Sequence, residues 1–170
     1  GPVLDPFHIE TLGIIPKLNS LLAAPHEEHE EHSGDRLEWT MSFPTSMVHR
    51  VSDPPHTSWT RGRTSPATFP RISNMRICLH DSPWVTNVVA SDQEVGVTCS
   101  DIIEALKASL NKPIMPEEFL NFSTDVQRRL SATYHRVHGS WNRTTPGLMR
   151  VDWFGNDPQF SGLERDQDYV

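Results

Sequence analysis

Residues 72–110 decide the fold class, and they contain the segments ISNMRICL (72–79), WVTNVVA (84–90) and TCSDIIEALKASL (98–110). The first two segments are rich in β-branched residues and are separated by the turn-forming residues 80–83 (HDSP). They predict neighbouring strands, as in a hairpin with a four-residue loop. In the third segment Thr98 and Asp101 have the spacing of a capping box, and the apolar residues that follow fall on one helical stripe. This segment predicts a helix over about residues 100–110.

A further strand signal lies upstream, where Leu37, Trp39, Met41 and Phe43 alternate strictly with polar residues. Such alternation is typical of a strand with one buried face and one solvated face. Residues 148–154 alternate in a similar way, and they predict a closing strand.

Two more helices are predicted between these segments. Pro116 stands at a first helical position and is followed by two glutamates, which predicts a short helix to about Phe122. The next helix is capped by Thr124, repeats apolar residues every three or four positions and ends at Gly139. Arginines occupy its other faces: Arg128, Arg129 and Arg136.

The order of these elements predicts the α+β class. We expect an antiparallel or mixed sheet of about four to five strands, two to three helices packed on one face, and a long proline-rich loop. A chain of 170 residues fits one such domain, over residues 3–170. Gly1-Pro2 matches the scar that a protease leaves after removal of an expression tag, so we exclude it from the domain.

Composition excludes several classes of function. The chain has 15 Lys and Arg against 22 Asp and Glu, a formal net charge of −7, and no basic cluster that would bind a phosphate backbone or an anionic membrane. No apolar run approaches the roughly 18–20 residues that cross a bilayer. We expect no nucleic-acid partner, no membrane partner and an intracellular location, in the cytoplasm or the nucleus.

Cys78 and Cys99 have apolar neighbours and are expected to be reduced, although one bridge between them stays open.

Residues 44–71, the proline-rich arm, are predicted to be irregular because their five prolines lack the amide donor that helices and central strands need. Loops of this length are usually either functional or disordered. The arm is basic, with four arginines against one aspartate. The other interpretation is a loop laid over the sheet, in which Trp59 and Phe69 only pack against it. The candidate partner contacts, including a tryptophan from a later loop, are Trp59, Arg61, Arg63, Phe69 and Trp141.

Three histidines, His26, His29 and His32, stand among four glutamates. Imidazole nitrogen and carboxylate oxygen are ordinary zinc ligands, so this tract could hold a divalent cation. Its spacing does not match the His-Glu-x-x-His pattern of metalloproteases. His135 and His138 form a second pair near a helix end. The sequence lacks a nucleophile elbow, a dinucleotide-binding glycine pattern and a Walker-type phosphate loop, so we expect no cofactor and favour a non-enzymatic role.

Five further motifs are Leu37-Glu38-Trp39-Thr40, Ser82-Pro83-Trp84, DIIEAL (101–106), Pro116-Glu117-Glu118-Phe119 and Arg150-Val151-Asp152. In their order and spacing they resemble a fungal family, found in mushroom-forming basidiomycetes and known as a domain of unknown function. The resemblance covers about residues 21–163. It implies a compact α+β domain and brings no established activity and no catalytic residues. In this resemblance Trp84 is expected to enter the core, and Asp152 to brace a turn or pair with Arg150 or Arg76.

These observations favour a non-enzymatic interaction module. We expect it to bind a protein or peptide through the arm and an adjoining sheet edge, where backbone groups could accept an added strand. An acidic segment would fit the basic arm. The alternative is a metal-binding or small-molecule enzyme that uses its histidines. A third hypothesis is self-association through an exposed apolar strip.

Overall fold

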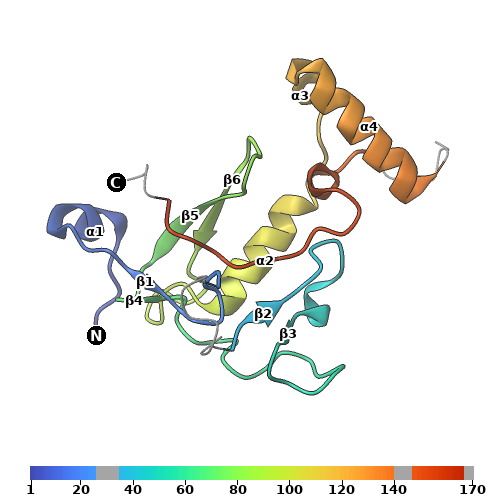
Figure 1. Cartoon of the computed structure of the whole chain (residues 1–170). Helices are drawn as coiled ribbons and strands as arrows, with labels where there is room; N and C mark the ends of the chain where they lie inside the picture. The colour runs from blue at the N-terminus through green and yellow to red at the C-terminus, as the bar shows by residue number, and fades with distance from the viewer. Residues whose placement is uncertain (26–34, 140–146, 167–170) are drawn as a thin grey trace.

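The structure is a computed structural model that describes residues 1–25, 35–139 and 147–166 (Figure 1). Its helices in these ranges are α1 (Pro6–Leu12), α2 (Cys99–Leu110), α3 (Pro116–Asn121) and α4 (Thr124–His138), with the 3₁₀-helices η2 (Thr45–Met47) and η3 (Arg150–Phe154). Its strands are β1 (Lys17–Leu18), β2 (Leu37–Glu38), β3 (His49–Arg50), β4 (Thr68–Phe69), β5 (Asn74–Cys78) and β6 (Val85–Val89).

The strands form three separate antiparallel pairs: β1 with β4, β2 with β3, and β5 with β6. The α+β class is confirmed, but the described ranges contain these three pairs in place of the expected sheet of four to five strands. Prolines flank the β1–β4 pair at Pro16, Pro66 and Pro70. Because proline cannot donate to a ladder, this pair stays two residues long on each side.

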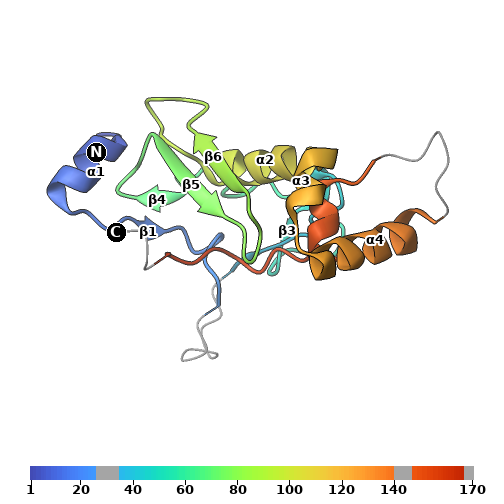
Figure 2. The same cartoon turned by 90° about the horizontal axis from the view of Figure 1, so that it is seen from above.

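The predicted hairpin is confirmed. Its register runs from the pair Asn74–Val89 to the pair Cys78–Val85, and residues 79–84 connect the two strands. The connection is two residues longer than expected, and it turns through a backbone hydrogen bond from Ser82 N–H to Leu79 O of 3.0 Å. One face of the hairpin is buried, and α2 packs against β6 on that face (Figure 2).

The predicted helix after the hairpin is also confirmed, and its capping box forms. The hydroxyl oxygen of Thr98 accepts a hydrogen bond from Asp101 N–H at 3.1 Å. The carboxylate of Asp101 accepts one from Thr98 N–H at 2.9 Å. These two bonds satisfy amides that have no partner inside the helix, so α2 begins at Cys99.

The described residues form two clusters of buried side chains, and α2 contributes to the larger one. The larger cluster lies among the hairpin, α2 and the arm, and its most deeply buried members include Leu22, Leu37, Trp39, Val48, Ile102 and Leu106. The smaller cluster, centred on Trp84 and Trp153, also contains side chains of α3 and α4. The two indole rings meet edge to face, with centroids 5.2 Å apart. Trp84 thus enters a core as expected.

The smaller cluster changes the expected arrangement of helices. The predicted α3 and α4 are both present, but they pack around the Trp84–Trp153 cluster, and in the described ranges α2 is the helix that packs against the hairpin strand β6. Ser123, one residue earlier than predicted, caps α4, because its hydroxyl accepts from Val126 N–H. In both views α4 extends away from the rest of the molecule (Figures 1 and 2).

The predicted strand at residues 37–43 is wrong in its length. Leu37, Trp39 and Met41 are buried, as the alternation predicts, but β2 ends at Glu38. The chain then turns through a hydrogen bond from Phe43 N–H to Thr40 O of 2.8 Å. Phe43 leaves the alternating face in this turn and is 52% exposed.

The predicted closing strand is wrong in its type, because residues 150–154 form the 3₁₀-helix η3. The carboxylate of Asp152 accepts a hydrogen bond from Met149 N–H at 2.8 Å and closes the turn. Asp152 therefore braces a turn, one of its two expected roles.

Helix α1 is not predicted above, although Asp5 caps it and Pro6 opens it. Among the described residues, no helix combines the length and the apolar character needed to cross a bilayer.

Candidate functional site

The proline-rich arm contributes side chains to the larger core. Val48, Trp59 and Ala67 are buried, and η2, β3 and β4 form within the arm, so it is less irregular than expected. Trp59 is only 2% exposed, and its indole N–H donates to Arg61 O at 3.0 Å. Trp59 thus packs as in the second interpretation of the arm, and it offers no surface to a partner.

Two of the four arginines of the arm form ion pairs within the protein. Arg63 donates to Ser100 Oγ, forms an ion pair with Glu104 of 3.1 Å, and lies over the Trp59 ring. Arg50 forms an ion pair with the carboxylate of Asp35. Arg61 is exposed and has no side-chain partner among the described residues.

The side chain of Phe69 is exposed, in contrast to the buried side chain of Trp59. Its side chain is 79% exposed, although it sits in β4 and pairs with Lys17 of β1. The following peptide bond, to Pro70, is cis. No other large hydrophobic side chain in the described ranges is as exposed.

A hollow of about 610 Å³ lies beside Phe69. Its lining is largely apolar, and the two charged side chains in it, Lys17 and Arg71, are both basic. The guanidinium of Arg71 donates to the carbonyl oxygens of Glu94 and Gly1, which hold it in place without cancelling its charge. The lining residues of the domain are Leu4, Lys17, Leu18, Asn19, Pro66, Thr68, Phe69, Pro70 and Arg71, and Gly1 and Pro2, which lie outside the domain as bounded above, also border the hollow.

Asn19 holds the two sides of this hollow together. Its side-chain amide donates to Pro66 O at 3.0 Å, and its backbone N–H donates to Ala67 O at 2.8 Å. Within the segment of β4, the Thr68 hydroxyl donates to Pro70 O at 2.8 Å. The two bonds of Asn19 position β1 against β4, and no further strand pairs with β1 in the described ranges.

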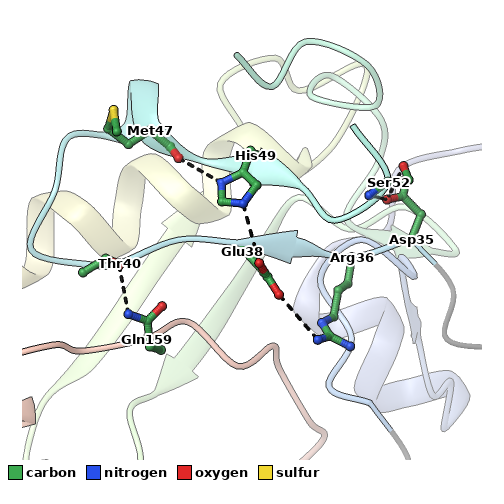
Figure 3. Close-up of polar contacts among 8 residues, drawn as sticks. All are labelled: Asp35, Arg36, Glu38, Thr40, Met47, His49, Ser52 and Gln159. Atoms are coloured by element: carbon green, nitrogen blue, oxygen red, sulfur yellow. Dashed lines mark hydrogen bonds and ion pairs between the residues drawn. The ribbon is translucent and has the colours of Figure 1, made fainter. Parts of the chain in front are cut away.

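Polar contacts at the base of the arm close the β2–β3 pair (Figure 3). Asp35 accepts hydrogen bonds from the backbone N–H and the hydroxyl of Ser52, at 3.3 and 2.7 Å. Glu38 lies between Arg36 and His49, 3.5 Å from each. The side chains of Glu38 and His49 are each nearly half exposed, so we interpret this group as a surface network that joins two strands.

The histidines do not converge in the described part of the chain. His26, His29 and His32 lie outside the described residues, as does Trp141. No three or more His, Cys, Asp or Glu side chains group to hold a metal elsewhere. His138 lies with its Nε2 3.6 Å from the buried carboxylate of Asp152, which supports the end of α4.

Neither cysteine forms a disulfide. Burial raises the pKa of Cys99 to about 12, so this thiol stays protonated at neutral pH and is a poor nucleophile. Cys78 is exposed at the end of β5.

A second hollow, of about 360 Å³, lies between the tip of the hairpin, α4 and η3. Its charged lining residues are of both signs: His80 and Asp81, 2.8 Å apart and both largely exposed, and Arg129. Arg129 lies over the Trp153 ring and donates to Trp153 O. This arrangement supports η3 and shows no preference for a ligand of one charge.

Sequence reasoning found Phe69 but missed the residues around it. Lys17, Leu18 and Asn19 come from a segment far from the arm in sequence, and no motif marks them. Arg71 is one of the four arginines of the arm, and the sequence does not distinguish it from the other three. Pairing between β1 and β4 brings these residues together.

Comparison with known proteins adds one finding. The model of a family described as a family of unknown function, DUF6699, matches residues 37–169. No curated protein and no solved structure gives a significant match.

Proposed function

Because the chain belongs to the DUF6699 family of unknown function, we propose a function from its own surface: a non-enzymatic module that binds a protein or peptide segment in the hollow beside Phe69. The observation that carries this proposal is the 79% exposure of Phe69 next to an apolar hollow. Exposed aromatic side chains in such places are common anchors of protein interfaces.

The chemistry of the hollow favours a particular kind of peptide. Its volume of about 610 Å³ is within the range that accommodates a large side chain and neighbouring backbone. Among the described residues that line it, the charged side chains are Lys17 and Arg71, and both are positive. The preferred segment therefore carries a bulky apolar residue flanked by aspartate or glutamate.

The backbone beside the hollow offers further contacts. β1 has no strand partner on its outer edge among the described residues, so an extended peptide can add there as a strand. Because β1 is only two residues long, side-chain burial against Phe69 supplies more of the affinity than backbone hydrogen bonds.

The experiment is a selection of peptides from a random library displayed on phage, followed by measurement of Kd by fluorescence anisotropy with a labelled enriched peptide. We expect enriched peptides to combine an apolar residue with acidic neighbours. Phe69→Ala should weaken binding at least about tenfold. Phe43→Ala, which removes an exposed phenylalanine elsewhere, is the matched control and should change Kd less than about twofold.

Two outcomes contradict the proposal: no enrichment over an unrelated protein of similar charge, or equal effects of Phe69→Ala and Phe43→Ala. Deletion of residues 52–65 is a poor test, because it removes the buried Trp59 and unfolds the core. The histidine-based alternative depends on residues 26–32, and no described group of ligands supports it. Metal analysis of untagged protein after dialysis against a chelator tests that alternative directly.

A further inference from the structure

Helix α4 carries a basic face on a chain whose net charge is −7. Its buried residues, Leu130, Thr133 and Tyr134, lie on one side of the helix. The residues on the opposite side are exposed, and the helix extends away from the body of the molecule in both views (Figures 1 and 2). We call this side the α4 face; its exposed residues are Asp125, Arg128, Ser131, Ala132, His135 and Arg136.

The arginines of the α4 face are less compensated than Arg50 and Arg63 of the arm. Arg136 has no ion pair or hydrogen-bonded side-chain partner among the residues that the structure describes. Arg128 lies 3.7 Å from Asp125, but the two side chains are 78% and 94% exposed, so solvent screens this pair. In contrast, Arg50 and Arg63 of the arm have close carboxylate partners. The α4 face therefore presents two exposed arginines whose charge no close carboxylate cancels.

The distance between Arg128 and Arg136 sets the spacing of the acidic groups that a partner needs. Arg128, Ala132 and Arg136 are four residues apart in turn, so they lie in one row along the helix. A rise of 1.5 Å per residue places the two arginines about 12 Å apart along the axis. Between them Ser131 and Ala132 are small, so a partner backbone can approach the helix closely.

We propose that the α4 face is a docking surface for an acidic protein segment whose two carboxylates pair with Arg128 and Arg136. In an extended segment, at about 3.3 Å per residue, carboxylates three to four residues apart match this distance. A short acidic segment can bind the α4 face without approaching the rest of the chain. A long nucleic acid also approaches the rest of the chain, which carries the negative net charge and repels it. This surface goes beyond the Phe69 hollow and is independent of it.

The test uses the whole protein and a short, fluorescein-labelled poly-L-glutamate as the probe, with Kd from fluorescence anisotropy at an ionic strength of about 0.02 M. The double variant Arg128→Glu/Arg136→Glu should bind at least about tenfold more weakly than the unmodified chain. Arg128→Ala/Arg136→Ala, which removes attraction without adding repulsion, should have an intermediate effect. Thermal unfolding and far-ultraviolet circular dichroism check that α4 remains folded in each variant.

The matched control is Arg61→Glu/Lys112→Glu, which changes the net charge equally at two exposed positions outside α4. It should change Kd less than about threefold, by long-range charge alone. The proposal is overturned if the unmodified chain does not bind the probe, or if the control loses as much affinity as the α4 variant. Tighter binding of a duplex DNA of similar charge, lost in the same α4 variant, would also overturn it and identify a nucleic acid as the partner class.

Discussion

The indole N–H of Trp84 donates a hydrogen bond of 2.9 Å to the carboxylate of Glu118. The other oxygen of this carboxylate accepts from the backbone N–H of Met115 at 3.0 Å. One side chain thus joins the smaller core to the first turn of α3, where Met115 has no hydroxyl with which to cap the helix. The glutamate satisfies the backbone N–H of the N-cap residue, as the acid of a capping box does, and it also satisfies a buried tryptophan.

The carboxylate of Glu118 makes the free energy of unfolding depend on pH. The hydrogen bonds from Trp84, and then from Met115, lower the pKa of Glu118 in the folded protein. Its contribution is therefore complete above the unfolded pKa of about 4.3 and is lost as the pH falls through the lower folded pKa. Glu118→Gln should lower the free energy of unfolding by about 1 kcal/mol at pH 7.

The measurement for Glu118 is urea unfolding at pH 7 and at about pH 3, since these values lie above and below the unfolded pKa of about 4.3. The difference between the two pH values should be smaller in Glu118→Gln than in the unmodified protein. An equal difference in both proteins would contradict this role. Glu117→Gln, at the exposed neighbour, is the control.

Truncation of the two aromatic residues of the arm should change the stability of the protein by very different amounts. Trp59→Ala removes a side chain that is 2% exposed, and it should lower the free energy of unfolding by about 3–5 kcal/mol. Phe69→Ala removes one that is 79% exposed, and it should change this energy by less than about 0.5 kcal/mol. Urea unfolding monitored by circular dichroism measures both, and a larger loss for Phe69→Ala would contradict the fold described here.

Gly162 stands where no side chain fits. Its φ is +98°, and an added Cβ would lie 2.6 Å from backbone atoms of Ala24. Gly162→Ala should lower the free energy of unfolding by at least about 2 kcal/mol, because both the clash and the left-handed backbone are unfavourable. Gly147→Ala meets nothing within 4 Å and is the control, with an unchanged or slightly higher stability. Thermal unfolding of the two variants decides the point, and equal midpoints would refute it.

The cysteines should differ in reactivity. Ellman's reagent should modify the exposed Cys78 rapidly in the native protein, while Cys99 should react only after unfolding, since it is buried with a pKa raised to about 12. Thiol titration before and after addition of guanidinium chloride measures this. Cys78→Ser is the control, and it should abolish the fast reaction. Fast modification of Cys99 in this variant would show that the helix start opens readily.

Local patterns predicted the parts of the fold that depend on local physics. The hairpin, α2 with its capping box, α3 and α4 all appear where periodicity and end signals place them. The pattern at residues 148–154 failed because one hydrogen bond, from Met149 N–H to Asp152, makes a 3₁₀-helix of an alternating segment. Alternation reports which residues are buried, and a short 3₁₀-helix can bury Trp153 as well as a strand can.

The candidate site shows the same division between local and long-range information. The sequence by itself determined that Phe69 lies in a proline-interrupted segment and that α4 is rich in arginine, because both are properties of neighbouring residues. Only the tertiary structure decided that Trp59 is buried while Phe69 is exposed. It alone also placed Lys17 beside Phe69 and paired the arm's arginines with Asp35 and Glu104. Burial and ion pairing are set by segments distant in the chain, and no local pattern encodes which of these segments meet.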